Sequence, residues 1–271
     1  MIDSNHIIAE GDVMKVAVKY VQARRSRLAQ LLQQHRFLPL TELCDKLGVS
    51  EATARRDLAV LAQEHKITRT YGGAMSSFDQ TFSSFRERQV RAPEAKKRIA
   101  LAVHDLIKPN STCFLDVGTT LFALADVLRQ KPIRGLTLVT NSLPIAEMLG
   151  PVRGYAVHLL GGQLFYRQSL LLGGVALQTL KLWKFDHAFL GAEGMTAEGI
   201  WNSQPDVIDF QLAVFKRSGQ SYVCLDAQKL DTQTDYLLVD WKANFSLITD
   251  ATPALLEKRG IQTKKGQLIS A

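Results

Sequence analysis

Residues 40–75 read LTELCDKLGVSEATARRDLAVLAQEHKITRTYGGAM, and this stretch decides the fold of the first part of the chain. Its apolar residues from Leu40 to Leu47 recur at the three- and four-residue steps of one helix face. Gly48 suits the left-handed backbone that ends a helix, and the Ser50 hydroxyl can accept from the amides that open the next one. The spacing predicts two short helices joined by a tight turn.

The second predicted helix separates apolar from polar residues. One side is apolar and carries Ala54, Leu58 and Leu61. The exposed N-terminal half carries polar residues, which are Glu51, Thr53, Arg55, Arg56 and Asp57. A helix enters the major groove of DNA with this half, and arginine matches the paired acceptors of guanine or a phosphate. An arginine pair alone is more often a solvated surface, but this one follows a Gly-Val-Ser turn.

The residues after this helix predict a small hairpin. Residues 67–71 alternate apolar and polar side chains and lead to Gly72 and Gly73, which is the pattern of a wing. Arg69 on this wing is placed to hold the DNA backbone. Helix, turn, helix and wing together predict a DNA-binding module much more specifically than any one of them.

The segment from Arg24 to Met75 resembles the DeoR family of bacterial transcription regulators. The winged helix-turn-helix of that family carries a Val-Ser-x-x-Thr-x-Arg-Arg-Asp-Leu stretch, which is Val49 to Leu58 here. Ala54 departs from the usual Ile, and the smaller side chain is expected to weaken core packing. Thr53, Arg55 and Arg56 are expected to read bases, and Arg24 or Arg25, before the first helix, to hold phosphates. The full set of predicted DNA contacts is Arg24, Arg25, Ser50, Thr53, Arg55, Arg56, Arg69 and Tyr71.

From Pro93 onward, helical stretches alternate with short apolar strands. The predicted helices are residues 93–107, 121–128, 144–149 and 210–217, and the predicted strands are residues 112–116, 136–140, 156–160, 187–190 and 222–226. Continuous apolar strands spaced by helices predict a largely parallel sheet covered on both faces. In such sheets, ligands bind beyond the carboxyl ends of the strands.

Polar and glycine-rich motifs follow these strands in turn. The first, residues 116–120, can present amides and hydroxyls to a phosphate at a helix N-terminus, although an ordinary strand-to-helix turn looks the same. A lysine after the last predicted strand can pair with phosphate as a point charge. The predicted effector-binding residues are Asp116, Gly118, Thr119, Thr120, Thr140, Asn141, Ser142, Gly161, Gly162, Glu193, Gly194, Asp226 and Lys229.

The resemblance to the DeoR family extends over nearly the whole chain, through DVGTT, VTNS, LLGG, GAEG and LDAQK in this order. It implies an α/β protein, with an N-terminal winged helix-turn-helix domain followed by a larger α/β sensor domain similar to ribose-5-phosphate isomerase. The family carries Asp-x-x-Lys where this chain has Asp226 to Lys229, and the implied effector is a phosphorylated sugar or a related metabolite. Gln211 departs, because the family more often has an acidic residue followed closely by Lys near Asp209.

Composition agrees with two domains. We expect an extension of unknown role at 1–20, the winged helix-turn-helix domain at 21–75, a linker at 76–92 and the sensor and oligomerisation domain at 93–271. A chain of 271 residues that is 46% hydrophobic can bury both cores, and its formal charge of +7 suits an anionic partner. Three cysteines without paired spacing are expected to be reduced core residues, so neither a metal nor a cofactor is expected. Without a membrane-length apolar stretch or a leader, the protein is expected to be cytoplasmic, with no membrane partner.

The expected function is regulation of transcription, as a repressor of a carbohydrate-metabolism operon. The expected partners are double-stranded operator DNA, a phosphorylated sugar and further copies of the chain. One alternative is an isomerase-like enzyme with an appended DNA-binding module, in which Asp116, Glu193 and Lys229 form an acid–base set. The sequence carries no HExxH, GxSxG, Walker or GxGxxG motif in support of an enzyme. Another alternative is a constitutive DNA-binding protein whose larger domain only oligomerises.

Overall fold

The computed structural model describes residues 10–35, 37–63, 67–70, 73–76 and 84–271. The chain divides into two compact units, residues 1–82 and residues 83–271, which we call the first and the second unit. Each is described by itself. None of the described helices is long and apolar enough to span a membrane.

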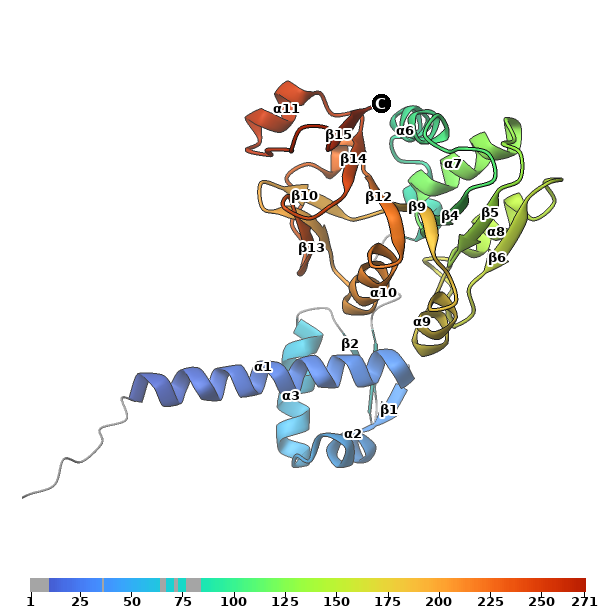
Figure 1. The fold of residues 1–271 in the computed structure, drawn as a ribbon. Helices are drawn as coiled ribbons and strands as arrows, with labels where there is room; N and C mark the ends of the chain where they lie inside the picture. Colours follow the sequence, from blue (N-terminus) through green and yellow to red (C-terminus); the bar gives the residue numbers. More distant parts are fainter. Residues whose placement is uncertain (1–9, 36, 64–66, 71–72, 77–83) are drawn as a thin grey trace, which may run out of the picture. The chain divides into compact units, whose positions relative to one another are not determined.

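The described residues of the first unit form three helices and a small antiparallel sheet (Figure 1). The sheet has the strand order β1-β3-β2. The helices are α1 (Glu10–His35), α2 (Leu40–Leu47) and α3 (Glu51–Gln63), and the strands are β1 (Phe37–Pro39), β2 (Ile67–Thr70) and β3 (Gly73–Ser76). The predicted helix-turn-helix and hairpin wing are confirmed, whereas strand β1, which pairs with β3, carried too short an apolar pattern to be predicted.

The turn between α2 and α3 has the predicted chemistry. Gly48 adopts φ 64°, and its amide and that of Val49 both bond to the Cys44 carbonyl oxygen, the latter at 3.2 Å. The Ser50 hydroxyl accepts from the Thr53 amide at 3.4 Å, and the Ser50 carbonyl accepts the first helical bond, from Ala54. These bonds satisfy polar groups that a helix end otherwise leaves open, and they fix the angle at which α3 leaves the turn.

A buried carboxylate ties α3 to α1. Asp57 is only 1% exposed, and its two oxygens accept from Nε of Arg24 at 2.6 Å and Nε of Arg25 at 2.9 Å. Burial opposes ionisation, but the hydrogen bonds from both arginines outweigh it and lower the pKa of Asp57. Around this pair, apolar residues of all three helices and of β1 and β2 form one core, which contains Leu28, Leu32, Leu38, Leu40, Leu43, Ala54, Leu58, Leu61 and Ile67.

We predict that Asp57→Asn destabilises the first unit by about 2 kcal/mol, because it removes two charge-assisted hydrogen bonds from a buried site. Since the folded pKa of Asp57 is depressed, wild-type stability from this site is present above the ordinary carboxyl pKa and is lost as the pH falls through the folded value. Circular dichroism of thermal unfolding measures the loss. Arg55→Gln, which breaks only the exposed pair with Glu51, is the matched control; equal losses in both variants would contradict the prediction.

The second unit is built on a seven-stranded sheet in which every neighbouring pair is parallel (Figure 1). Its strands, in spatial order, are β15 (Leu268–Ser270), β14 (Ser246–Thr249), β12 (Ser218–Cys224), β9 (Phe185–Leu190), β4 (Thr112–Leu115), β5 (Thr137–Thr140) and β6 (Ala156–Leu159). The chain runs outward from β4 through β5 to β6, and then from β9, on the other side of β4, through β12 to β15. The order therefore reverses between β4 and β9, and the crevice at such a reversal is the usual ligand position.

Both faces of this sheet are covered. Cys113 and Leu115 face one core with α6 (Pro93–His104), α7 (Thr119–Gln130) and α8 (Leu143–Leu149), while Phe114 between them faces a second core. This second core is closed by α9 (Gly174–Leu180), by α10 (Pro205–Phe215) and by the hairpin of β7 (Gln163–Phe165) and β8 (Leu170–Leu172). A third core, which includes α11 (Pro253–Lys258), packs under a small antiparallel sheet of β10 (Gly194–Thr196), β11 (Gly199–Asn202) and β13 (Tyr236–Asp240).

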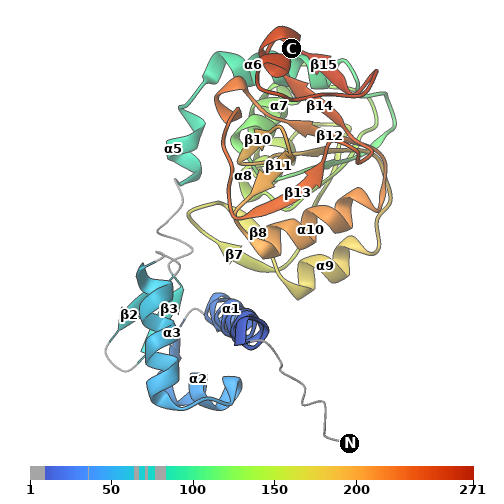
Figure 2. The same cartoon turned by 90° about the vertical axis from the view of Figure 1, so that its left-hand side faces the viewer.

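The stretch at 76–92, expected to be a linker, contains a short helix, α5 (Phe85–Gln89), which runs on toward α6 (Figure 2). The Ser84 hydroxyl accepts from the Glu87 amide at 3.2 Å, and the Glu87 carboxylate accepts from the Ser84 amide at 2.7 Å. This reciprocal capping box holds a helix too short to show apolar periodicity. Its Ser-x-x-Glu spacing was the available sign.

Candidate functional sites

The N-terminal half of α3 presents two arginines to solvent. Arg55 and Arg56 are exposed, and Arg55 pairs with Glu51 one turn earlier at 3.2 Å. Thr53 is half-buried, and its hydroxyl lies 3.0 Å from that of Ser50. Three predicted base readers thus share one accessible end of a helix. Asp57, expected at this exposed end, is instead buried against α1, because its position four residues before Leu61 turns it toward the core.

Arg24 and Arg25 lie before the first predicted helix, as expected, but within a further helix, α1. Their Nε atoms donate hydrogen bonds to Asp57, so the two residues orient α3. On the wing, Arg69 belongs to β2 and stands opposite Ala74 of β3. Tyr71 lies outside the described residues.

Asp116 occupies the point where the strand order reverses. It follows β4, is 1% exposed, and its Oδ2 accepts from Nε2 of Gln211 at 2.6 Å and from the Gly191 amide at 3.3 Å. Its Oδ1 accepts from the Val117 amide at 2.8 Å. Burial raises the pKa of Asp116 to about 6, although these hydrogen bonds work in the opposite direction. The carboxylate therefore joins the end of β4, the end of β9 and helix α10.

Gln211 extends this network. Its Nε2 also donates to the Gly191 carbonyl oxygen at 2.7 Å, and its Oε1 accepts from Nδ2 of Asn202 at 2.6 Å. Gln211 departs from the family pattern as a neutral amide that binds a buried carboxylate. Among the described residues, the partners of Asp116 are all neutral, so the cost of burying its charge is largely uncompensated.

The motif after β5 is brought to the same edge of the sheet. The Thr140 hydroxyl donates to the Leu115 carbonyl oxygen at 2.6 Å and accepts from the Ser142 amide at 3.0 Å. Oδ1 of Asn141 accepts from the Val117 amide at 3.0 Å. These side chains are buried and shape the loop after β4. Gly118 then caps α7, whose first turn carries Thr119, buried, and Thr120, half-buried.

A group of charged residues lies at the same edge of the sheet. The Ser203 hydroxyl lies 2.7 Å from Oε1 and 2.6 Å from Oε2 of Glu193, and burial raises the pKa of this carboxyl against the influence of Ser203, Arg88 and Lys229. Asp226 is buried and caps the short helix η1 (Ala227–Lys229) by accepting from the Gln228 amide. We call the charged residues that act on one another here the charged cluster; they are Arg88, Arg91, Lys96, Glu193, Asp226 and Lys229.

Three predicted glycines have reasons inside the fold. A Cβ added to Gly162 would lie 2.4 Å from the Leu172 carbonyl oxygen, and one added to Gly194 would lie 1.9 Å from that of Thr232. At Gly161 the nearest atom is a side-chain carbon of Val175, at 3.3 Å. The close approach expected of Gly161 and Gly162 is thus to the chain's own backbone and side chains, since β8 and α9 pack on the loop after β6.

The sequence did not indicate several polar residues of this edge. Arg88 was assigned to a linker, and nothing in local spacing links Gln211 to Asp116, 95 positions earlier. Lys96 is only 5% exposed, although lysine side chains are rarely buried, and burial lowers its pKa to about 8. The unpredicted members of this edge are Arg88, Lys96, Gln168, Asn202, Ser203 and Gln211.

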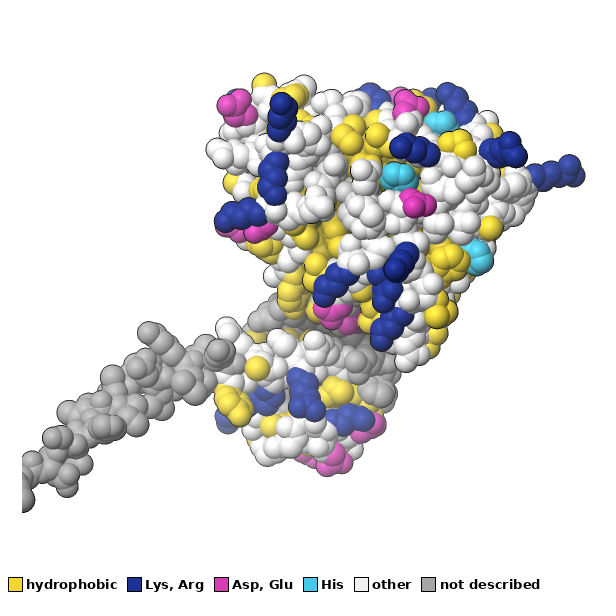
Figure 3. Space-filling view, in the orientation of Figure 1, with side chains coloured by type: hydrophobic (Ala, Val, Ile, Leu, Met, Phe, Trp, Pro, Cys, Tyr) yellow, Lys and Arg dark blue, Asp and Glu magenta, His cyan; other side chains and the backbone are white. Residues whose placement is uncertain are grey.

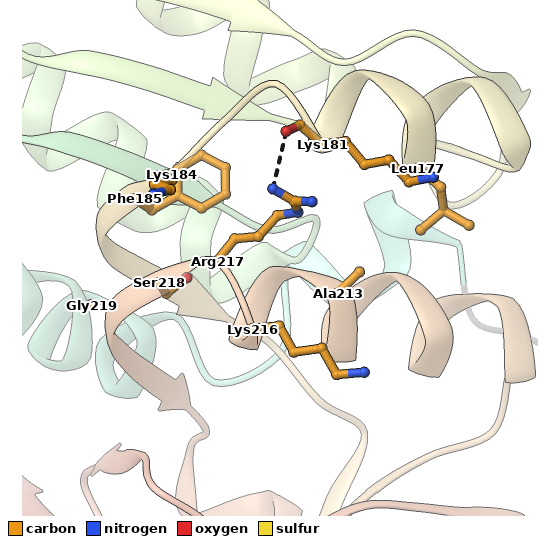
Figure 4. Close-up of a pocket in the computed structure, with 9 residues that line it drawn as sticks. All are labelled: Leu177, Lys181, Lys184, Phe185, Ala213, Lys216, Arg217, Ser218 and Gly219. Atoms are coloured by element: carbon orange, nitrogen blue, oxygen red, sulfur yellow. Dashed lines mark hydrogen bonds between the residues drawn. The ribbon is translucent and has the colours of Figure 1, made fainter.

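A basic groove of about 690 Å³ lies at the opposite, amino-terminal edge of the sheet, between α9 and α10 (Figures 3 and 4). Lys181 and Lys216 are the C-cap residues of these helices, and Nη1 of Arg217 donates to the Lys181 carbonyl oxygen at 3.0 Å. Cations at helix C-termini compensate the helix dipole. This accounts for most of the charge, and no predicted effector residue lines the groove.

We predict that Asp116 makes stability depend on pH. Its folded pKa is raised above the ordinary value, so the contribution is complete at low pH and is lost as the pH rises through about 6. Between pH 4.5 and 7, wild type should lose about 2 kcal/mol relative to Asp116→Asn. Urea unfolding followed by tryptophan fluorescence measures this, with Asp126→Asn, at a half-buried position of α7, as the matched change. Parallel pH profiles of wild type and Asp116→Asn would contradict it.

Comparisons with known proteins agree with this division of the chain. Residues 24–80 match the family model of the DeoR-like helix-turn-helix domain, and residues 91–251 match that of the DeoR C terminal sensor domain. The chain is 28% identical to the HTH-type transcriptional repressor GlcR of Bacillus subtilis over 90% of this chain and 95% of that protein. It is 32% identical to the glycerol-3-phosphate regulon repressor of Escherichia coli over 65% of this chain and 69% of that protein.

Among solved structures, the chain is similar to ribose 5-phosphate isomerase from Plasmodium falciparum, with a TM-score of 0.34 and 17% identity over 51% of this chain and 52% of that one. The two family models cover both units, in the order in which the structure places a helix-turn-helix and a parallel α/β sheet. The chain belongs to the DeoR family of transcriptional regulators.

Proposed function

We propose that the protein is a repressor whose affinity for its operator DNA is lowered when it binds a phosphorylated sugar. Thr53, Arg55 and Arg56 read bases in the major groove, and Arg69 of the wing holds the DNA backbone. The observation that carries this proposal is the position of Arg55 and Arg56 at the exposed end of α3, while Asp57 beside them is locked to Arg24 and Arg25. A recognition helix held in one orientation loses little freedom when it binds.

The effector binds at the carboxyl edge of the parallel sheet. Gly118, Thr119 and Thr120 offer amides and hydroxyls at the start of α7, and Lys229 supplies a positive charge, which together suit a phosphate. Glu193 suits a hydroxyl group of a sugar, while Asp116, whose oxygens accept from Gln211 and from two backbone amides, holds the surrounding loops in place. Relatives named after the glycerol-3-phosphate regulon and, in Streptococcus mutans, the lactose phosphotransferase system support a carbohydrate-related effector.

The two units respond to one another through unequal binding. The effector must bind free and DNA-bound protein with different affinity, and a coupling of about 1 to 3 kcal/mol changes operator affinity roughly 5- to 150-fold. The second unit also joins copies of the chain, so that two recognition helices reach two half-sites together. A regulator of this kind works in the cytoplasm, where the DNA is.

The same edge of the sheet is proposed to bind without catalysis. A sugar-phosphate isomerase needs a base that is free to take a proton beside a carbonyl. The oxygens of Asp116 already accept from Gln211, Gly191 and Val117, and those of Glu193 are held by Ser203. Proton NMR of ribose 5-phosphate and glucose 6-phosphate incubated with the protein in D₂O tests this, and exchange of the C2 proton at an enzyme-like rate would overturn it.

We predict that Arg56→Ala weakens operator binding by about 1 to 3 kcal/mol, because it removes a base-reading guanidinium. The operator is first obtained by selecting duplexes from a random library with the wild-type protein. Fluorescence anisotropy at fixed salt then measures the affinity. Arg134→Ala, the same change at an exposed site of the second unit, should leave it unchanged. Equal affinity of Arg56→Ala and wild type would remove the recognition helix from the proposal.

We predict that Lys229→Ala weakens binding of phosphorylated sugars and spares operator affinity in their absence, since the proposal gives Lys229 a role in effector binding and none in reading DNA. Calorimetry with glucose 6-phosphate, fructose 1-phosphate and glycerol 3-phosphate, each beside its unphosphorylated form, provides the measurement. Lys181→Ala removes the same charge from the basic groove and is the matched control. A larger loss in Lys181→Ala, or equal binding of sugars with and without phosphate, would refute this location.

A further inference from the structure

Helix α5 is the first described element of the second unit and is held by a few specific contacts. Besides its capping box, the Phe85 ring packs edge-on against Phe122 of α7 with centroids 5.3 Å apart. The Phe85 amide donates to the Arg167 carbonyl oxygen at 2.8 Å. Nζ of Lys96 donates to the carbonyl oxygens of Arg88 and Arg91, the first at 2.5 Å. Five residues of helix are not stable alone, so these contacts decide whether α5 is formed.

Arg88 on this helix is a charged group whose bonding capacity is incompletely used. Its Nε is buried and has no hydrogen-bond partner among the described residues. Burial lowers the pKa of Arg88, and the opposite charge that acts on it is Glu193. Within the part of the chain that the structure describes, no carboxylate lies within ion-pairing distance of it. Buried guanidinium groups are normally paired, so Arg88 is suited to a further anion.

Two more unsatisfied polar groups lie on segments that are tied to α5. Ser142 and Gln168 are buried, and neither the Ser142 hydroxyl nor either amide atom of the Gln168 side chain has a partner among the described residues. The turn that carries Gln168 accepts from Phe85 of α5 through Arg167 and from Leu143 through Ser169. The segments that carry Arg88, Gln168 and Ser142 are therefore linked by backbone hydrogen bonds at the carboxyl edge of the sheet. Their unpartnered side-chain atoms include both donors and acceptors, which suit a polar ligand.

The sign of the charge indicates what this ligand carries. In the charged cluster, the cations Arg88, Lys96 and Lys229 act together with the two carboxylates Glu193 and Asp226, which leaves an excess of positive charge. A phosphate monoester carries a charge of about −1.5 to −2 at neutral pH. A phosphate therefore matches the sign of this excess, whereas a neutral sugar leaves it uncompensated.

We propose that Arg88 binds the phosphate of the effector and thereby makes α5 the element that reports effector occupancy to the DNA-reading unit. This rests on the proposed function. Residues 77–83 alone separate β3 of the first unit from Ser84, so α5 is the first part of the second unit that the connection reaches. A ligand that binds only when α5 is formed shifts the population toward that state. Binding and signalling are then one event at Arg88.

Calorimetry of the full-length protein tests the binding step, with glucose 6-phosphate, fructose 1-phosphate, glycerol 3-phosphate and inorganic phosphate as probes. For the phosphorylated probe that wild type binds most tightly, Arg88→Gln should weaken binding about 10- to 100-fold, as loss of a charge-assisted contact does. The probe affinity of Arg88→Lys should lie between those of wild type and Arg88→Gln. Arg86→Gln, the same change at an exposed position of α5, should stay within about twofold, as matched control. Arg88→Gln within twofold of wild type overturns the proposal.

The signalling step is tested at probe concentrations that saturate each variant. Operator affinity of wild type and Arg86→Gln should shift on adding the probe, and that of Arg88→Gln should shift much less, each shift being measured from the affinity of the same protein without probe. Hydrogen exchange of residues 84–91 should slow with probe in wild type and not in Arg88→Gln. A full shift in saturated Arg88→Gln overturns the signalling role.

The two proposals fail in different ways. If wild type binds none of the phosphorylated probes, or if binding leaves operator affinity unchanged, the proposed function itself fails and this inference falls with it. If wild type responds and Arg88→Gln responds equally, the proposed function stands and only the role of Arg88 is refuted. The variants are compared after thermal unfolding has shown equal melting temperatures, and Arg88→Lys keeps the comparison possible if Arg88→Gln does not fold.

Discussion

The carboxylate of Asp116, buried where the strand order reverses, is the constraint on which the second unit depends. A charge removed from water must find donors, and here they come from Gln211 of α10, the Gly191 amide after β9 and the Val117 amide after β4. These segments meet only if β4 and β9 are neighbours and α10 lies across their ends. The same bonds that satisfy Asp116 thus fix the shape of the edge where the effector is proposed to bind.

The first unit uses the same physical device for another purpose. Asp57 is buried on the recognition helix, and Arg24 and Arg25 of α1 are its partners. The difference lies in the counterion. Two guanidinium groups lower the pKa of Asp57, whereas a neutral amide and backbone donors leave that of Asp116 raised to about 6. The orientation of α3 is therefore stabilised over the physiological pH range, while Asp116 remains costly to ionise. A ligand donor near Asp116 would recover part of that cost.

Positive charge in the second unit has two distinct origins. In the groove between α9 and α10, Lys181, Lys216 and Arg217 lie at helix C-termini, and such positions stabilise a helix without any ligand. In the charged cluster, Lys96 is buried and Arg88 is half-buried with an enclosed Nε atom, although burial disfavours a charge and lowers the pKa of both. Charge that opposes stability is more informative about function than charge that supports it, because some other gain must offset its cost.

Local sequence alone predicted the helix-turn-helix, the wing, and five of the seven strands of the parallel sheet with helices between them, but not β1, α5, β14 or β15. Apolar periodicity and the residues Gly48 and Ser50 fixed the helix-turn-helix, because caps and helix faces depend on neighbours within a turn or two. Apolar strands spaced by helices fixed the parallel sheet and put the polar motifs at its carboxyl ends. A pattern this regular needs no knowledge of distant contacts, and it also predicted Asp116, Glu193 and Lys229 as members of one edge.

Only the tertiary structure decided which of these residues meet which partner. Gln211 reaches Asp116 across 95 positions, Asp57 turns inward to Arg24 and Arg25, and Arg88 joins the charged cluster from a segment without periodicity. Side-chain pairs of this kind depend on strand order and on the packing of α1, α5 and α10, which no local pattern encodes. The sequence determined where the polar and charged residues lie along the chain. The fold decided which of their side chains are buried together and therefore pair.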